Sequence, residues 1–410
     1  MTTHQLETRC CIAGGGPAGI MLGYLLARAG IDVTVLEKWP DFFRDFRGDT
    51  IHPSTMEILK ELGLLDEFLT LPHSEMERMT VHFGTTEVTV ADLRHVPATC
   101  KFIAFIPQWD FLTFLATKGK AYPEFHLMME TEATDLIEEN GRVVGIKAVG
   151  KENGAETVYE IRSDLVVGAD GRHSTVREKG GFEVEELGVP IDVLWFRIGK
   201  SGVDDKQSLG YLNRGAGLVM LDRADYWQCA LIIQKGNYEA VKEQGIEAFR
   251  TRVAELAHLP DEALAEVDSW DKVKFLSVSV DHVRTWAREG LVLIGDAAHA
   301  MSPIGGVGIN YAVQDAVATA NILTPFFTEE SGKAPLALLQ RIQARREYPT
   351  RRMQKLQVLL QDRVLSPVLH ESGDFRAPWF IHIFNVIPFL RRIPARIIGI
   401  GFLPEHVSNL

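Results

Sequence analysis

The sequence contains little cysteine, with four residues among 410. Cys10 and Cys11 are adjacent in an apolar run, whereas Cys100 and Cys229 stand alone, so their spacing does not form a disulfide framework. No basic cluster near the adjacent pair would activate a thiol, which favours packing in a strand over redox chemistry. We therefore expect a reducing, cytoplasmic environment and no metal site.

Long apolar runs and positive charge are also lacking. No segment supplies the ~20 uninterrupted apolar residues of a membrane-spanning helix, and the polar start from Met1 to Arg9 lacks the order of a secretion signal. The 43 basic residues are outnumbered by 55 acidic ones, which gives a net charge of -12. The lack of a long apolar run predicts no transmembrane segment, and because this field repels phosphate backbones and anionic lipid, we expect no nucleic-acid partner.

The chain does have a large apolar fraction, 46%, which can bury a core shared by two or more lobes. Near the start, the apolar run 10–13 is followed by glycines and then by apolar residues at helical spacing over 20–26. A second apolar run, 33–36, ends in Glu37. This order predicts a strand, a tight turn, a crossover helix and a parallel strand.

Other patterns indicate the remaining elements. Residues 53–65 predict a helix, with Gly63 near its end. Asn140-Gly141 predicts a hairpin between strands over 134–139 and 143–149. The apolar runs 165–167 and 291–294 each stop at glycine plus aspartate, which predicts two core strands that end at a ligand, and helices are expected from Asn310 onward.

Two separated stretches, about 79–105 and about 190–280, consist of alternating apolar and polar runs. We interpret them as one antiparallel sheet assembled from both stretches. Because the chain has no internal repeat and no low-complexity linker, its lobes are expected to interleave along the sequence.

The first chemical motif is Gly14-Gly15-Gly16-Pro17-Ala18-Gly19, placed between the first strand and the first helix. Gly14 permits a tight turn, Gly16 lets the backbone approach a pyrophosphate, and Gly19 lets the helix pack close to the strand. Glu37 follows at the position of an acidic residue that accepts hydrogen bonds from an adenosine ribose. The motif predicts a dinucleotide site, and alone it does not separate NAD from FAD.

Two later motifs narrow this choice. The first is 170–177, Asp-Gly-Arg-His-Ser-Thr-Val-Arg, and the second is Gly295-Asp296-Ala-Ala-His299, followed by Pro303, Gly306, Gly308 and Asn310. In this order, the three motifs resemble the single-component (class A) FAD-dependent aromatic hydroxylases, the family of p-hydroxybenzoate hydroxylase. The resemblance covers roughly the whole chain.

The resemblance implies an α/β fold with interleaved lobes. A Rossmann-like FAD-binding lobe would comprise residues 1–75, 106–185 and 285–330. A substrate-binding lobe built on the antiparallel sheet would comprise 76–105 and 186–284. A helical C-terminal region, 331–410, would follow.

The resemblance also implies a set of cofactor-binding residues. The Asp-Gly segment would serve both the flavin and the nicotinamide nucleotide, Asp296 would contact the ribityl chain, and the loop from Pro303 to Gly308 would run beside the isoalloxazine ring. Val307 replaces a glutamine that many family members carry. The expected set is Gly14, Gly16, Pro17, Ala18, Gly19, Glu37, Arg47, Gln108, Asp170, Arg177, Gly295, Asp296, Pro303, Gly306, Val307, Gly308, Ile309 and Asn310.

The implied reaction is hydroxylation of an aromatic or similarly electron-rich small molecule. NADPH or NADH would reduce FAD, O2 would add to give a flavin C4a-hydroperoxide, and its distal oxygen would pass to the substrate. The alternatives are a halogenase or a reductase on the same fold, or a flavin-binding protein without turnover. The Trp-x-Trp-x-Ile-Pro signature of flavin halogenases is absent.

No catalytic acid or base can be assigned from the sequence. His299 is interpreted as part of the cofactor motif that fills a turn. Candidates for the substrate pocket or the flavin edge come from the sheet, from the stretch after Arg47, and from the glycine loop. They are Asp49, His52, Trp195, Tyr211, Met220, Trp227 and Pro303.

The tract from Trp379 to Leu403 is strongly apolar, but Pro388, Pro394 and three arginines interrupt it. This pattern excludes a spanning helix. It leaves packing over the flavin lobe, a dimer contact or an interfacial membrane helix as alternatives. The sequence is compatible with a monomer or a homodimer.

Overall fold

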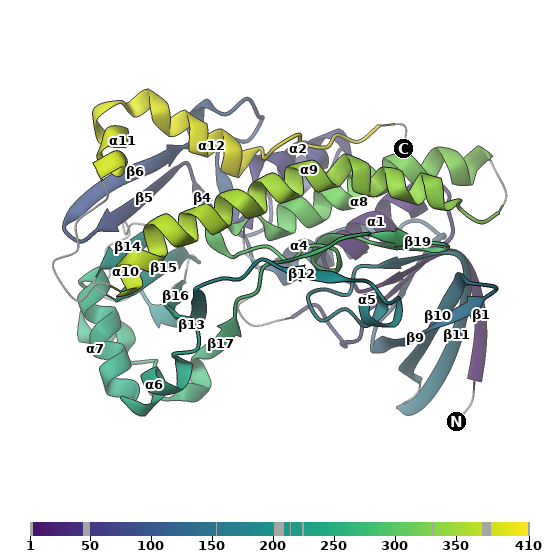
Figure 1. Cartoon of the computed structure of the whole chain (residues 1–410), viewed down its shortest axis with the longest axis horizontal. Coiled ribbons are helices and arrows are strands. Elements are labelled where there is room, and N and C mark those ends of the chain that lie inside the picture. Colours follow the sequence, from purple (N-terminus) through teal and green to yellow (C-terminus); the bar gives the residue numbers. More distant parts are fainter. Residues whose placement is uncertain are drawn as a thin grey trace.

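The computed structural model describes residues 3–43, 50–152, 154–200, 209–213, 215–223, 225–329, 332–370 and 379–408. Two predicted site residues, Arg47 and Asp49, lie outside the described residues. The fold is α/β, as predicted, with a helical C-terminal region (Figure 1).

The main sheet is parallel at its centre. Its path runs β19 (Ala287–Arg288), β20 (Leu291–Leu293), β11 (Ala155–Gly168), β1 (Thr3–Ala13), β2 (Val33–Leu36) and β8 (Phe125–Met128), and only the β19–β20 pair on this path is antiparallel. Every residue of β2 is buried, as expected of a parallel strand covered on both faces. The predicted strand, turn, crossover helix and parallel strand are confirmed as β1, α1 (Pro17–Arg28) and β2.

The predicted hairpin is also confirmed. β9 (Thr131–Glu139) and β10 (Arg142–Glu152) pair antiparallel, and β10 continues onto β11. Asn140 has a φ of 51° and Gly141 a φ of 78°, the left-handed conformations that a two-residue hairpin turn requires.

A set of helices packs on the main sheet and links its strands to the rest of the chain. They are α1, α2 (Pro53–Glu61), α3 (Leu65–Phe68), α4 (Gln108–Gly119), α5 (Thr175–Lys179), α8 (Gly308–Glu329) and α9 (Leu336–Leu360). The single helix predicted over 53–65 is wrong in its extent, since α2 stops at Glu61 and α3 starts at Leu65. Gly63, with a φ of 74°, makes the break between them.

The second sheet has seven strands, in the order β17 (Lys274–Ser277), β13 (Ile191–Gly199), β16 (Tyr226–Gln234), β15 (Ala216–Asp222), β14 (Gly210–Asn213), β5 (Arg78–Phe83) and β6 (Thr86–Asp92). It joins the two predicted stretches, but it is not wholly antiparallel, because β14 and β5 pair parallel. These strands belong to separate passages of the chain, so no hairpin imposes an antiparallel direction on them.

Smaller elements complete the strand set. β7 (Ile103–Phe105) does not join the seven-stranded sheet as predicted, because it pairs with β3 (Thr50–Ile51) and β4 (Ser74–Met76). β12 (Val184–Glu186) pairs with β18 (Asp281–Val283). The 3-10 turns are η1 (Leu93–His95), η2 (Asp261–Leu264), η3 (Trp270–Lys272), η4 (Gly295–Ala297) and η5 (Ile304–Gly306).

The two faces of the seven-stranded sheet bury different clusters. One face packs against α6 (Tyr238–Glu243) and α7 (Ile246–Ala257) through residues such as Leu194 and Phe196. The alternate residues Val193 and Trp195 lie on the other face, with Ile304 of η5. Because successive side chains of a strand point to opposite faces, the face with Val193 and Trp195 is the one that approaches the glycine loop, Pro303 to Gly308.

The C-terminal region reaches from the main sheet to the second sheet. Helix α9 runs beside α8 and continues through a π-helical turn, η6 (Gln361–Leu365), into α10 (Ser366–His370) at the second sheet (Figure 1). The remaining elements are η7 (Trp379–His382), α11 (Ile383–Val386), η8 (Pro388–Arg391) and α12 (Arg392–Gly399). Within the described ranges, no helix is long and apolar enough to cross a membrane.

A buried ionic cluster fixes α9 against α8. Asp315 of α8 accepts a hydrogen bond of 2.8 Å from Nε of Arg346 on α9, and both side chains are fully buried. The other carboxylate oxygen accepts from Nε2 of His299 at 2.6 Å and from the amide of Gly295 at 3.0 Å. Burial alone would raise the pKa of Asp315, but His299 and Arg346 together hold it below its usual value.

We expect Arg346→Met to lower the free energy of unfolding by about 3–5 kcal/mol, because it leaves the Asp315 carboxylate buried without its guanidinium. Chemical denaturation at pH 7 measures the loss. Arg352→Met is the matched control, since Arg352 is an exposed arginine of the same helix. Equal stability losses in the two variants would contradict the role given to the buried pair.

Candidate active site

The first glycine turn is built by close backbone contacts. A Cβ on Gly14, whose φ is 102°, would lie 2.3 Å from the carbonyl oxygen of Ala169, and one on Gly19 would lie 1.9 Å from the carbonyl oxygen of Gly14. Gly16 caps α1, with Pro17 at the first helical position, and a Cβ there would meet no atom within 4 Å. The turn therefore leaves open space before the amino end of α1, as a bound pyrophosphate requires.

Glu37 holds this turn through its carboxylate. One oxygen accepts a hydrogen bond of 3.1 Å from the amide of Gly15, and the other accepts one of 3.1 Å from the amide of Trp39. The side chain is largely buried at the end of β2. These contacts fix where the carboxylate lies, and its predicted contact with a ribose stays a prediction.

The Asp-Gly segment forms a second turn directly beside the first. Asp170 accepts hydrogen bonds from the Ser174 hydroxyl and, at 3.1 Å, from the Val176 amide. Ser174 in turn caps α5 by accepting from the Arg177 amide at 2.9 Å. Burial raises the pKa of Asp170, and its hydrogen bonds offset part of that rise.

The third turn, at Gly295-Asp296, meets both of the others. A Cβ on Gly295 would lie 3.1 Å from Cβ of Ala18. Nε of Arg172 donates to Oδ2 of Asp296 at 3.1 Å, and another guanidinium nitrogen of Arg172 donates to the Met301 carbonyl at 3.1 Å. Three motifs far apart in the sequence thus lie together, in the order and with the backbone exposure that a flavin dinucleotide needs.

Arg177 adds a further link between the second and third turns. Its guanidinium donates to the Ala297 carbonyl at 3.4 Å and lies 3.6 Å from the Asp281 carboxylate. Neither Arg172 nor Asp281 is among the site residues predicted from the sequence. Arg172 lies inside the Asp-Gly motif, so the motif could have indicated it, whereas Asp281 is identifiable only once β18 is placed.

The glycine loop, Pro303 to Gly308, is tied to β3. Gly305 and Gly306 have φ values of 79° and 63°. The Gly306 carbonyl accepts a hydrogen bond of 2.7 Å from the Thr50 hydroxyl, and Asn310 donates to the carbonyls of Thr50 and Gly306 at 3.1 and 3.3 Å. The loop ends at the amino end of α8, where a Cβ on Gly308 would meet nothing within 4 Å. An open helix end here would favour an anionic ring edge.

Three predicted cofactor residues of this segment point into the protein. Val307 is buried against Met301 and Tyr311, and Ile309 packs in the main core. Asn310 uses its remaining amide oxygen to accept from the His52 amide at 2.8 Å and the Thr55 hydroxyl at 2.7 Å. These side chains position the loop, so any contact of theirs with a cofactor would be through backbone atoms.

A row of buried glutamines on α9 and η6 holds the segment before this loop. Gln357 donates to the Ser302 and Ile304 carbonyls at 2.9 and 2.8 Å and accepts from the Ser302 amide at 3.2 Å. Gln361 donates to the Ser302 hydroxyl at 2.7 Å. Gln354 donates to the carbonyls of Asp281 and Ala300 at 2.7 and 3.0 Å. The spacing 354, 357, 361 places all three on one helix face, a signal that the sequence analysis missed.

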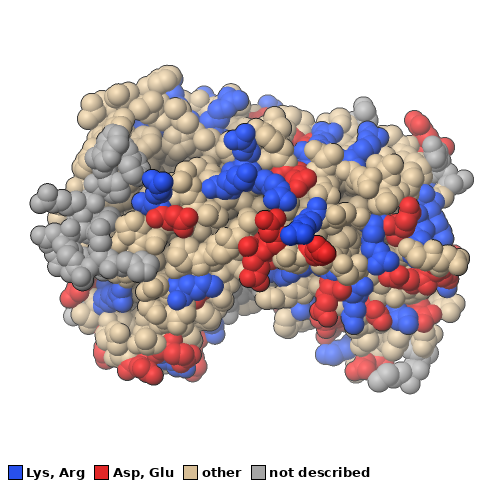
Figure 2. All heavy atoms as spheres, in the orientation of Figure 1, with Lys and Arg blue, Asp and Glu red and all other residues tan. Residues whose placement is uncertain are grey.

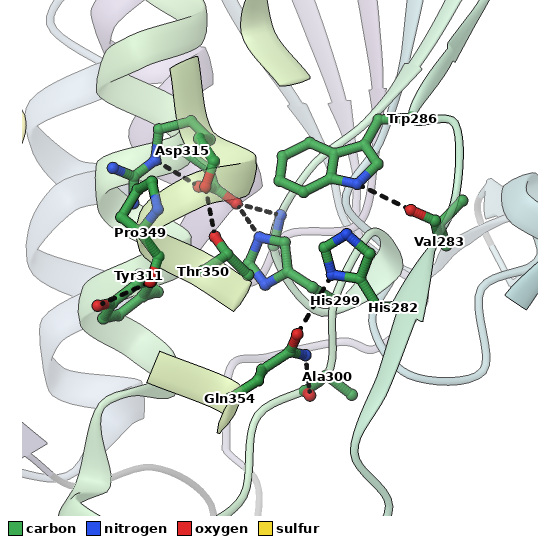
Figure 3. Close-up of polar contacts among 12 residues, drawn as sticks. His282, Val283, Trp286, His299, Ala300, Tyr311, Asp315, Pro349, Thr350 and Gln354 are labelled. Atoms are coloured by element: carbon green, nitrogen blue, oxygen red, sulfur yellow. Dashed lines mark hydrogen bonds and ion pairs between the residues drawn. The ribbon is translucent and has the colours of Figure 1, made fainter. Parts of the chain in front are cut away.

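The imidazoles of this region belong to the same buried scaffold. Figure 3 shows His299 between Asp315 and the rings of Trp286 and His282. Burial, and then the neighbouring His299, lower the pKa of His282 to about 4. The placement of His299 agrees with its interpretation as a structural residue of the turn.

The substrate candidates from the sheet divide between its two faces. Tyr211, Met220 and Trp227 lie on the face that packs against α6 and α7, away from the glycine loop. We therefore correct these three assignments and do not propose them as pocket residues. Trp195 lies on the face shared with Ile304. Gln108 is the first residue of α4, and its contact with a ribityl chain stays a prediction.

The similarity of this chain to known proteins agrees with this geometry. A family model described as an FAD binding domain matches residues 7–355. The chain is 32% identical over 370 residues to the 6-methylpretetramide 4-monooxygenase of Streptomyces rimosus, an alignment that covers 88% of this chain and 85% of that enzyme.

Two solved structures share the fold. OxyS anhydrotetracycline hydroxylase from Streptomyces rimosus superposes with a TM-score of 0.74 at 21% identity, covering 96% of this chain and 76% of that one. PqsL from Pseudomonas aeruginosa superposes with a TM-score of 0.72 at 20% identity, covering 89% and 97%.

The chain belongs to the family of FAD-dependent aromatic hydroxylases, because the family model spans most of its length. It is an FAD-dependent monooxygenase, and NAD(P)H is the electron donor typical of this family.

We expect Asp296→Ala to weaken FAD binding by ~10-fold to 100-fold, the effect of losing a hydrogen bond to a charged group. Equilibrium titration of apoprotein with FAD measures the dissociation constant. Asp268→Ala is the control, because Asp268 is exposed and pairs with Lys272 four residues later, far along the chain from the three turns. Unchanged FAD affinity in the Asp296 variant would remove this aspartate from the site.

Gln357→Leu is expected to raise the FAD dissociation constant about tenfold, because the loop segment loses its ties to α9. Gln340→Leu, an exposed glutamine of the same helix, should leave it unchanged. The same titration distinguishes the two. If Gln357→Leu lowered only the free energy of unfolding, the glutamine row would stabilise the fold without positioning the cofactor loop.

Proposed function

We propose that this monooxygenase hydroxylates a phenolic substrate of several fused rings, of the aromatic polyketide class. The observation that carries this proposal is the 32% identity to the 6-methylpretetramide 4-monooxygenase, over 85% of that enzyme. The geometry supports it by leaving an apolar sheet face, with Trp195 and Val219, next to the glycine loop.

We propose the division of labour along the chain that the sequence suggested. Residues 1–75, 106–185 and 285–330 hold FAD, residues 76–105 and 186–284 bind the substrate, and 331–410 brace both. The crossing of α9 from one lobe to the other supports this division, as do its contacts with the 300–304 segment.

The residues proposed to hold FAD lie on the three turns and at the end of β2, where Gly16 borders open space. The backbone amides of Gly16 and Ala18 would take the pyrophosphate, Glu37 the ribose and Asp296 the ribityl chain. When bound and reduced by NAD(P)H, FAD would activate O2, so that one oxygen atom passes to the substrate ring and the other leaves as water. The protein would orient the substrate and exclude water, for which the half-buried loop and the apolar sheet face are suited.

Two buried nitrogen atoms support a polar substrate contact. Nε1 of Trp195 and Nε2 of His52 are buried without a hydrogen-bond partner. Nδ1 of His52 donates to the Ile398 carbonyl at 2.8 Å, and burial lowers the pKa of His52 to about 4, so the neutral ring presents Nε2 as an acceptor. Trp195 presents a donor.

This pair matches a phenol. A substrate hydroxyl would donate to His52, and a ring carbonyl or a second phenol oxygen would accept from Trp195. Both residues lie around the same loop, since Trp195 packs in the cluster that contains Ile304 and in the cluster that contains Ile398. An unmade hydrogen bond at a buried atom is costly, so a bound substrate that pairs both atoms would gain affinity.

The direct test is oxidation of NADPH and NADH by the FAD-loaded enzyme with and without 6-methylpretetramide. We expect the substrate to stimulate oxidation and to be recovered with one added oxygen atom. Stimulation by simple phenols alone would retain the monooxygenase and overturn the polyketide proposal. No stimulation by any aromatic tested, at full FAD occupancy, would favour a flavin-binding protein without turnover.

Trp195→Phe should raise KM for this substrate by ~3-fold to 10-fold and change kcat less, because the variant loses one hydrogen bond to bound substrate. Trp227→Phe is a close control, since its indole nitrogen is also buried and unpaired but lies on the opposite face of the sheet. Equal effects of the two substitutions would contradict the assignment of Trp195 to the pocket.

A further inference from the structure

The C-terminal segment from α11 to Pro404 exposes an unusual amount of apolar surface. Val386 is 78% exposed, Ile387 48%, Phe389 64%, Ile393 54% and Leu403 62%. Four of these five lie within eight consecutive residues. Large apolar side chains that are exposed together, and not singly, mark an interaction surface.

The charge of this segment is opposite to that of the whole chain. Residues 379–404 contain Arg391, Arg392 and Arg396 and no aspartate or glutamate, whereas the chain as a whole carries -12. In the part of the chain that is described, neither Arg392 nor Arg396 forms an ion pair with a carboxylate. The guanidinium carbon of Arg392 lies 4.8 Å from the centroid of the exposed Phe389 ring. The apolar patch therefore has cations at its edge.

The position of this surface is fixed by the inner side of α12. Ala395, Gly399 and Ile400 are buried, and a Cβ on Gly399 would lie 2.9 Å from Cδ2 of Leu93. The helix cannot turn its exposed side inward without breaking that contact. In Figure 1, α11 and α12 lie at the upper left, outside β5 and β6, and the same upper-left part of the surface in Figure 2 is mostly uncharged, with basic side chains beside it.

We infer that this surface, defined as Val386, Ile387, Phe389 and Ile393 with Arg392 and Arg396, binds the surface of an anionic lipid bilayer. Apolar side chains would enter the headgroup boundary, and the guanidiniums would pair with lipid phosphates. A second copy of the chain fits less well, because a twofold contact would bring the same arginines of the two copies together.

Helix α12 also connects this surface to the proposed substrate site. His52, proposed to face the substrate, donates to the carbonyl of Ile398 on the inner side of α12. Helix α12, which would face the lipid, would thus also form the back of the substrate site. The substrate site would then lie next to the bilayer, into which an apolar polycyclic substrate partitions. This link rests on the proposed function, whereas lipid binding does not.

The experiment is flotation of the FAD-loaded protein with vesicles of phosphatidylcholine, or of phosphatidylcholine with phosphatidylglycerol. We expect binding to the anionic vesicles, weak binding to the neutral ones, and a loss of binding between 0.1 and 1 M salt as the Debye length falls from about 10 to 3 Å. No turnover is measured, so failure of the proposed function would leave this result standing.

Two pairs of substitutions locate the contact. Arg392→Gln with Arg396→Gln should weaken binding to anionic vesicles by ~20-fold, about fivefold for each cation near the lipid surface. Val386→Ser with Phe389→Ser should weaken binding at low and high salt alike. Leu359→Ser is the control, because Leu359 is 51% exposed on α9 and lies outside the surface. Circular dichroism and FAD content verify folding of each variant.

Three outcomes would overturn the inference. They are no flotation with anionic vesicles at low salt, equal binding to neutral vesicles, and unchanged binding in both double variants. Light scattering without lipid gives a fourth, since a dimer that the serine variants dissociate would assign the surface to a second copy of the chain.

Discussion

The site depends on one constraint, the close approach of three backbone turns around Gly14. The carbonyl of Ala169 occupies the place of a Gly14 side chain, and the carbonyl of Gly14 occupies that of a Gly19 side chain. The Asp-Gly turn and the amino end of α1 can lie together only because these positions lack Cβ atoms. The Gly295 turn then packs on Ala18, and the face presented to a dinucleotide follows from these contacts.

A second layer of polar groups keeps the turns in place. Asp315 holds the Gly295 amide from behind, Gln357 holds Ser302 and Ile304, and Asn310 and Thr50 hold Gly306. These contacts are hydrogen bonds between neutral groups, or they involve charges that pair with each other inside the protein. They hold the segment that would face the cofactor without placing a charged protein side chain against the flavin ring. This arrangement suits an enzyme whose cofactor carries the reaction.

The local parts of this architecture could be predicted from the sequence, because glycine turns and the Asn140-Gly141 hairpin depend on residues that are neighbours in the chain. Alternation along the strands showed that half of the sheet residues share a face, but it could not show which face meets the glycine loop. Tyr211 and Trp227 were assigned to the wrong side for that reason. The parallel pairing of β14 with β5 and the contacts of Gln357 depend on how distant segments meet, which no local pattern encodes.

The C-terminal helix α12 lies between the proposed substrate site and the exposed apolar surface. In the sequence, residues 379–403 were an apolar tract with three arginines, and three interpretations remained open. In the structure, Gly399 anchors α12 on Leu93 and Pro53, so the same eight-residue helix offers a buried carbonyl to His52 and guanidiniums to the outside. A movement of α12 on a bilayer would change the hydrogen bond that sets the His52 tautomer, and with it the acceptor presented to a phenol. The proposed substrate contact and the inferred lipid contact therefore share one short element.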